Sequence, residues 1–145
     1  MPAQLVPFAR VEPAVPAVWH FPAGILGFPE VKAYRFLAAA PGPFRWLQAH
    51  EVPLAFVVVD PWLVVPDYHV ALDASALHTL NAHAESTLTA VAIVTLPSQP
   101  ADPPTVNLQG PLVLNLDTGL AMQLVLAHGP YHTRHPLVAP PVPAP

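Results

Sequence analysis

The sequence predicts an all-β fold, a small antiparallel barrel-like domain of short strands with one or two short helices. Prolines account for 22 of the 145 residues and occur along the whole chain, and each proline inside a helix would cost about 3 kcal/mol. Hydrophobic residues make up 53% of the chain and charged residues 10%, a composition that a disordered tail does not have. Short apolar or alternating runs are separated by proline and glycine, which is typical of strands joined by turns.

Ten segments carry this strand pattern. In 112–116 the three leucines share one face, and 68–72 alternates in the same way. The segments 54–59 and 88–96 have little polarity on either face, so we expect them at the centre of the sheet, covered on both sides. The ten predicted strands are 5–10, 17–21, 34–39, 44–49, 54–59, 68–72, 88–96, 105–108, 112–116 and 121–126.

Two segments are candidates for short helices. Asp73 can cap a helix over 74–82, whose leucines at an i, i+3 spacing would pack onto the sheet. A single helical turn is predicted at 29–33, with proline at its first position. The domain is expected to span residues 1–138, and the proline-rich segment 139–145 is expected to form a flexible C-terminal tail.

Charge and composition exclude several functions. The five basic residues are scattered and the formal net charge is −4, so we expect no direct binding to nucleic acid. Every long uncharged stretch contains prolines, which argues against a membrane span. The N-terminus lacks the pattern of a signal peptide, and we expect a cytoplasmic protein. The absence of cysteine fits a reducing compartment and excludes thiolate chemistry.

One loop leaves an enzymatic alternative open. His128, His132 and His135 are spaced four and three residues apart and could bind a metal. The alternative function is therefore a metal-dependent or hydrolytic β-barrel enzyme that uses this loop. Gly129 and Pro130 indicate a loop rather than a helix that would align the ligands, and no serine is flanked by the glycines of a nucleophile elbow. We therefore predict no catalytic activity, no metal, no cofactor and no small-molecule substrate.

The shortage of charge instead favours a protein-binding surface. A chain of this length buries only about 68% of its surface. With so few charged residues, apolar side chains must remain exposed, and exposed apolar patches mark sites for protein partners.

Seven motifs occur in order along roughly residues 4–138: FPAGILGF (21–28), FRWLQ (44–48), LAFVVVDP (54–61), PDY (66–68), AIVTL (92–96), TVNLQGP (105–111) and YHTRHPL (131–137). Together, in this order and spacing, they resemble the FliW family of flagellar assembly factors.

The resemblance implies a cytoplasmic bacterial regulator without catalytic activity. Proteins of this family bind CsrA, the carbon storage regulator and an RNA-binding translational repressor, and they also bind flagellin. Flagellin captures the FliW-like protein and frees CsrA to repress flagellin synthesis, and export of flagellin reverses this. The antagonism of CsrA acts away from its RNA-binding surface and is therefore allosteric.

The chain departs from the family pattern in charge. Family members commonly carry a more acidic surface than nine acidic residues provide, and 119–123 replaces a more basic stretch. We therefore expect apolar contacts to carry more of the CsrA interface here. The candidate partner-binding residues lie on turns of the matched motifs: Ile25, Leu26, Trp62, Asn107, Tyr131 and Arg134.

Overall fold

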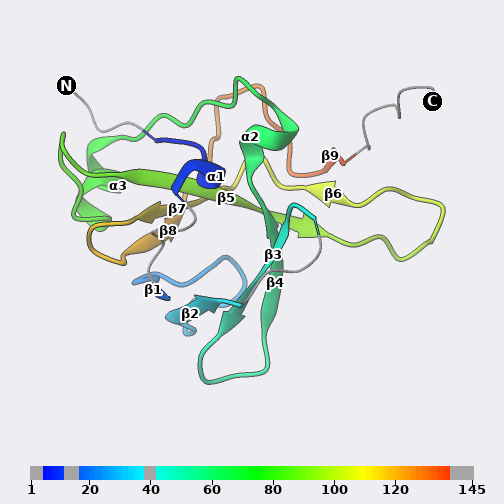
Figure 1. Ribbon diagram of the computed structural model, residues 1–145, viewed down its shortest axis with the longest axis horizontal. Coiled ribbons are helices and arrows are strands. Elements are labelled where there is room, and N and C mark those ends of the chain that lie inside the picture. Colours follow the sequence, from blue (N-terminus) through cyan, green and yellow to red (C-terminus); the bar gives the residue numbers. More distant parts are fainter. Residues whose placement is uncertain (1–4, 12–16, 38–41, 138–145) are drawn as a thin grey trace.

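The computed structural model describes residues 5–11, 17–37 and 42–137, and within these ranges strands predominate (Figure 1). The all-β prediction is confirmed. No helix in the described part of the chain is long and apolar enough to cross a membrane. The helices are α1 (Phe8–Val11), α2 (Pro61–Val64) and α3 (Ala74–Thr79). The strands are β1 (Val18–His20), β2 (Ala33–Phe36), β3 (Phe44–Ala49), β4 (Ala55–Val59), β5 (Leu88–Thr95), β6 (Thr105–Val106), β7 (Leu112–Asn115), β8 (Ala121–Gln123) and β9 (His135–Pro136).

The long strand β5 organises the sheet and pairs antiparallel with β4, β6 and β7. In its second half, Val94 lies between Val57 of β4 and Val106 of β6. Its first half pairs with β7, with Leu88 opposite Asn115. The strand order is β1-β2-β3-β4-β5-β6-β9, with β7 and β8 branching from β5. The predicted central position of 88–96 is confirmed, because β5 is almost wholly buried.

The strands curve into a barrel that does not close. The chain from β1 to β5 and then through β7 and β8 returns toward β1. There, the N–H of His20 donates to the carbonyl of Gly119 at 2.9 Å, and His20 forms an isolated bridge with Leu120. A single bridge is not a ladder, so the fold is barrel-like and has a seam between β8 and β1.

Alternation along the strands divides the interior into two cores. Leu112 and Leu114 point into the first core and Val113 into the second, as the alternation of 112–116 predicts. The first core contains Phe8, Trp19, Phe21, Ile25, Tyr34, Leu47, Ala49, Val58, Val91, Leu112, Leu114 and Ala121. The second contains Val59, Tyr68, Val70, Leu80, Ala92, Val94, Val106, Leu108 and Val113.

The helix predicted after Asp73 is present but shorter than expected. The Asp73 carboxylate accepts a hydrogen bond from the N–H of Ala76 at 2.8 Å and caps α3. The helix ends at Thr79 rather than at residue 82, because Asn81 takes a left-handed conformation with φ 51°. Leu80 is buried in the second core, where its carbonyl accepts a hydrogen bond from the Asn115 side chain at 2.8 Å.

Two predicted strands are not strands. Within 5–10, Leu5 makes only an isolated parallel bridge with Leu88, and the chain turns into α1 after Pro7, which has no N–H to contribute to a ladder. The segment 68–72 alternates as predicted, with Tyr68 buried and His69 exposed, but no strand in the described part of the chain pairs with it. The alternation therefore marks an extended segment that covers the second core.

Other differences are local. The segment 29–33 forms a turn rather than a helix and leads directly into β2. Ala55, at the start of β4, is exposed, so this strand is not covered on both sides along its whole length as predicted. The helix α2 and the two-residue strand β9 were not expected. The proposed tail at 139–145 lies outside the described residues.

Candidate partner-binding surfaces

The glycine turn at 21–28 buries one apolar side chain and exposes the next one to solvent. Gly24 adopts φ 69°, and its N–H donates to the carbonyl of Phe21 at 2.9 Å. Ile25 is only 2% exposed and belongs to the first core, whereas Leu26 is 69% exposed. Gln123 of β8 holds the turn in place, because its side-chain oxygen accepts a hydrogen bond from the N–H of Leu26 at 2.8 Å. A shallow pocket of about 220 Å³ lies between the turn and Gln123.

Replacing Gly24 with alanine is expected to destabilise the protein much more than replacing Gly27. A Cβ on Gly24 would lie 2.5 Å from the carbonyl oxygen of Phe28 and 2.7 Å from Cα of Pro29, both backbone atoms that cannot move freely. At Gly27, where φ is 91°, a Cβ would meet nothing within 4 Å, so only the backbone conformation is unfavourable. We expect a loss of about 3 kcal/mol or more for Gly24→Ala and about 1–2 kcal/mol for Gly27→Ala, measured by urea denaturation. Equal losses would contradict the close approach at Gly24.

Three aromatic rings in contact lie beneath a second candidate surface, which is formed by Trp62 and Tyr131. Tyr68 is 4% exposed, and its hydroxyl donates to the carbonyl of Leu108 at 2.6 Å. The ring of Trp62 meets the ring of Tyr68 edge-on at 5.6 Å, and the ring of Tyr131 lies 4.6 Å from it on a tilted plane. The hydroxyl oxygen of Tyr131 accepts a hydrogen bond from the N–H of His69 at 2.8 Å. These contacts fasten the loop that contains Tyr131 to the segment 68–72.

The stability of the protein should fall at high pH because of Tyr68. Burial, and secondarily the neighbouring Tyr131, raise the pKa of Tyr68 above its usual value near 10. Above about pH 10 the folded state therefore keeps a proton that the unfolded chain has lost, so folding becomes less favourable as the pH rises. Chemical denaturation between pH 7 and 11 should show this loss. Tyr68→Phe should be less stable at pH 7 and should show a smaller loss above pH 10, with the contribution of Tyr34 remaining. An unchanged pH profile in Tyr68→Phe would contradict the assignment.

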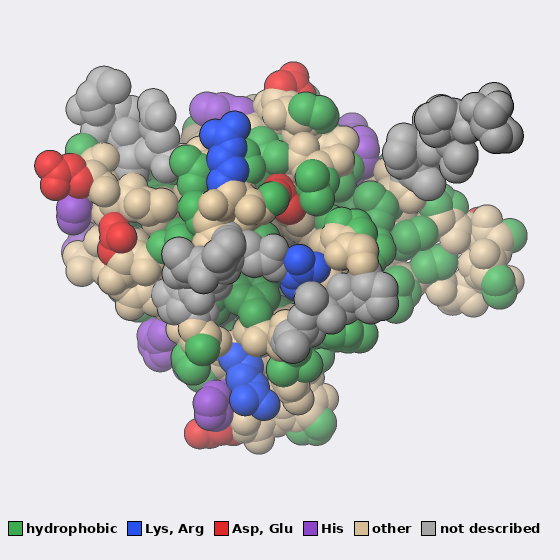
Figure 2. All heavy atoms as spheres, viewed as in Figure 1, with side chains coloured by type: hydrophobic (Ala, Val, Ile, Leu, Met, Phe, Trp, Pro, Cys, Tyr) green, Lys and Arg blue, Asp and Glu red, His purple; other side chains and the backbone are tan. Residues whose placement is uncertain are grey.

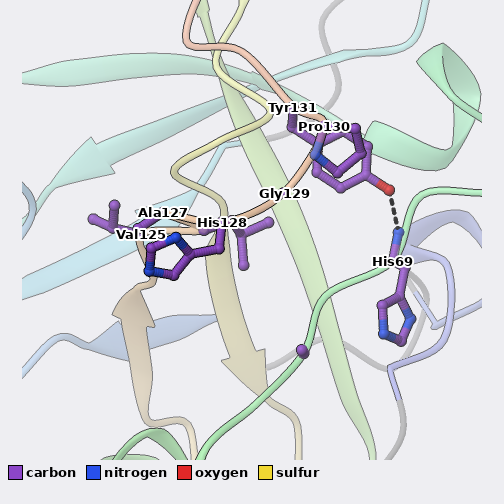
Figure 3. A pocket seen from close by; sticks show the side chains of 9 residues that line it. His69, Val125, Ala127, His128, Gly129, Pro130 and Tyr131 are labelled. Atoms are coloured by element: carbon purple, nitrogen blue, oxygen red, sulfur yellow. Dashed lines mark hydrogen bonds between the residues drawn. The ribbon is translucent and has the colours of Figure 1, made fainter.

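Beside Tyr131, a groove of about 440 Å³ opens between the segment of His69 and Ala71 and the loop that follows β8 (Figure 3). His69 and Ala71 form one wall, and residues 125–131 form the other. Figure 3 shows the imidazole rings of His69 and His128 on the two sides of this space. Val125, one of the apolar lining residues, is 55% exposed. The groove therefore offers an accessible apolar wall together with two imidazole groups.

The structure places the six candidate residues in different environments. Leu26 and Arg134 are exposed, while Trp62 and Tyr131 are half-buried around Tyr68. Ile25 differs from the other candidates, because its side chain is buried in the first core rather than presented on the surface.

The Asn107 side chain stabilises a turn. Its side-chain oxygen accepts a hydrogen bond from the N–H of Gly110 at 2.8 Å and shapes the turn before β7. The two features that sequence reasoning missed are Gln123, which joins the glycine turn to β8, and the groove walls at 69–71 and 125–129. The alternation of residues in 68–72 was the one sequence pattern that could have indicated the first of these groove walls.

The three histidines of the enzymatic alternative do not converge. His128 lines the groove, the carbonyl of His132 accepts a hydrogen bond from the N–H of Leu108 at 3.1 Å, and His135 lies in β9. Within 5–11, 17–37 and 42–137, no group of three His, Asp or Glu side chains could hold a metal ion. The geometry therefore gives the enzymatic alternative no support.

Few charges interrupt the apolar surface. Figure 2 shows hydrophobic side chains spread over one face of the molecule, with acidic and basic groups set singly among them. The exposed large hydrophobic residues occur on several elements: Val18, Leu26, Trp46, Val52, Leu63, Leu96 and Val125. Exposed hydrophobic residues that are scattered in this way are normal on protein surfaces, so they do not by themselves mark one binding site.

Comparisons with known proteins decide the family. The family described as FliW protein matches residues 5–137. The chain belongs to the FliW family of flagellar assembly factors. It is 40% identical over 118 residues to the flagellar assembly factor FliW of Treponema denticola, an alignment that covers 80% of this chain and 79% of the relative. It is 43% identical over 123 residues to the FliW of Geotalea uraniireducens, covering 82% of this chain and 73% of that protein.

A solved structure confirms the fold of the FliW family in this chain. The crystal structure of a flagellar assembly factor FliW superposes with a TM-score of 0.77 at 33% identity, covering 87% of this chain and 89% of the other. The resemblance carried by the seven motifs is therefore confirmed, and so is the link to flagellum assembly.

Proposed function

We propose that the protein is a cytoplasmic, non-catalytic regulator that switches between two protein partners. It binds the translational repressor CsrA and relieves the repression of flagellin synthesis. It also binds flagellin, which withdraws it from CsrA until flagellin is exported. The observation that carries this proposal is membership of the FliW family over nearly the whole chain.

The surface of the protein supports protein binding rather than catalysis. Leu26 is 69% exposed and is held by Gln123 in a fixed turn, so an apolar contact is presented on a rigid support. The Tyr131 loop offers a second contact region with apolar walls. Because the switch requires the two partners to exclude one another, their contact regions on this protein must overlap or be energetically coupled.

Isothermal titration calorimetry with CsrA and flagellin from the same organism tests the proposal. We expect saturable binding to each partner. Because the chain carries only nine acidic residues, the affinity for CsrA should change little between low and high salt. A steep loss of CsrA affinity with salt would contradict the apolar interface, and no binding to either partner would overturn the proposed function.

A further inference from the structure

The extended chain beyond β8 ends in an unpaired edge. The N–H groups of Leu124 and Leu126 donate to the carbonyls of Pro111 and Gln109 at 2.9 and 2.7 Å, which continues the pairing of β7 with β8 by alternate residues. The N–H of Val125, the residue between them, has no acceptor within the described residues. Since backbone groups of successive residues in an extended strand point to opposite sides, the N–H of Val125 is directed away from β7.

The groove follows this edge. Residues 125–131 form one of its walls, and the segment of His69 and Ala71 forms the other. Within the described residues the N–H of Ala71 also lacks an acceptor. A strand lying in the groove could therefore bond with unpaired backbone groups while its side chains contact Val125, Leu126 and Pro130.

The charge of the groove restricts the occupant. The lining contains two imidazole groups, those of His69 and His128, and no carboxylate. Arg134 lies exposed further along the same loop, and the exposed Asp67 lies outside the lining. Imidazole N–H groups at the rim favour a carboxylate on the occupant and disfavour a basic segment.

We propose that the groove between 69–71 and 125–131 binds an extended, apolar segment of flagellin that carries a carboxylate and adds as a strand to the edge at Val125. This inference rests on the proposed function. Of the two proposed partners, CsrA binds RNA, which requires a basic surface, so a groove with imidazoles and no carboxylate fits flagellin better.

The first test uses the proline variant of the edge residue. Val125→Pro removes the outward N–H but keeps the donors of Leu124 and Leu126, and proline is tolerated on a free edge. We expect it to bind flagellin about tenfold more weakly or worse, and to bind CsrA as the wild type does. Val125→Ala, which keeps the N–H, is the matched control and should lose less affinity. Wild-type affinity of a folded Val125→Pro variant for flagellin would overturn the inference.

Amide hydrogen exchange on the wild-type protein gives a readout that needs no variant. The amide of Val125 should exchange fast in the free protein and at least about tenfold more slowly in the flagellin complex. Protection by CsrA alone, or flagellin binding without protection of Val125, would contradict the inference while leaving the proposed function intact. If flagellin does not bind the wild type at all, the proposed function itself fails.

Charge reversal at the rim tests the nature of the occupant. His128→Glu should weaken flagellin binding, because a carboxylate would face the carboxylate of the bound segment. His50→Glu adds the same charge at an exposed position outside the groove and should have no effect. Equal effects of the two variants would contradict a local carboxylate contact.

Discussion

Replacing Leu114 with alanine is expected to lower the free energy of unfolding by about 3–5 kcal/mol. Leu114 is fully buried in the first core, and in β7 it lies between Thr89 of β5 and Ala121 of β8. Truncation there leaves a cavity in the first core, and the backbone pairing of β7 with β5 and β8 prevents the strand from moving to fill it. The melting temperature should fall by about 10 °C.

An exposed leucine provides the control for this substitution. Leu63 in α2 is 60% exposed, and Leu63→Ala should change stability by no more than about 0.5 kcal/mol. Both variants can be compared by urea denaturation followed by circular dichroism. A loss below about 1 kcal/mol for Leu114→Ala would mean that the first core is loosely packed.

Asp60→Ala should cost about 2–4 kcal/mol, since it removes a buried carboxylate that joins distant parts of the chain. Asp60 is 4% exposed. Its two oxygens accept hydrogen bonds from the N–H of Trp62, at the start of α2, and from the N–H of Ala9 in α1, each at 2.9 Å. Without the carboxylate, both donors lose their acceptor, and α1 loses its attachment to α2.

The matched control is the cap of α3. Asp73 is exposed and accepts one hydrogen bond, from Ala76, so Asp73→Ala should cost about 1 kcal/mol. Hydrogen exchange should also show faster exchange of the α1 amides in Asp60→Ala but not in Asp73→Ala. Equal losses of stability in the two variants would show that the link from Asp60 to Ala9 contributes little.

Patterns that are local in the sequence predicted the two strands at the centre of the fold, β5 and β7. In β7 the alternation of leucine with Val113 and Asn115 specifies two buried faces, and the structure places these faces in two different cores. The cap at Asp73 was predictable because its bond to Ala76 is local in sequence. The central position of β5 followed from its lack of polar residues.

Non-local contacts account for what the sequence did not predict. The segment 68–72 alternates like a strand, yet its partner is the hydroxyl of Tyr131, 62 residues from His69 in the chain. The pattern of Asp60 followed by Pro61 is a cap followed by a first-turn proline, which could have indicated α2. The groove could not be predicted, because its two walls meet only in the folded chain.

The burial of Ile25 beside the exposed Leu26 shows the same limit at the candidate site. Both residues lie in one glycine turn with apolar side chains, and sequence alone gives them equal weight. The left-handed conformation of Gly24 and the bond from Leu26 to Gln123 decide which one faces outward. The direction of a side chain in a turn thus depends on a residue of β8 that lies 97 positions away.

A competition titration tests the partner switch most directly. CsrA is titrated calorimetrically into the protein alone and into the protein saturated with flagellin from the same organism. The partner-switching account predicts saturable binding in the first titration and at least about tenfold weaker apparent binding in the second. The same CsrA affinity with and without bound flagellin would show that the partners bind independently, and it would contradict the switch.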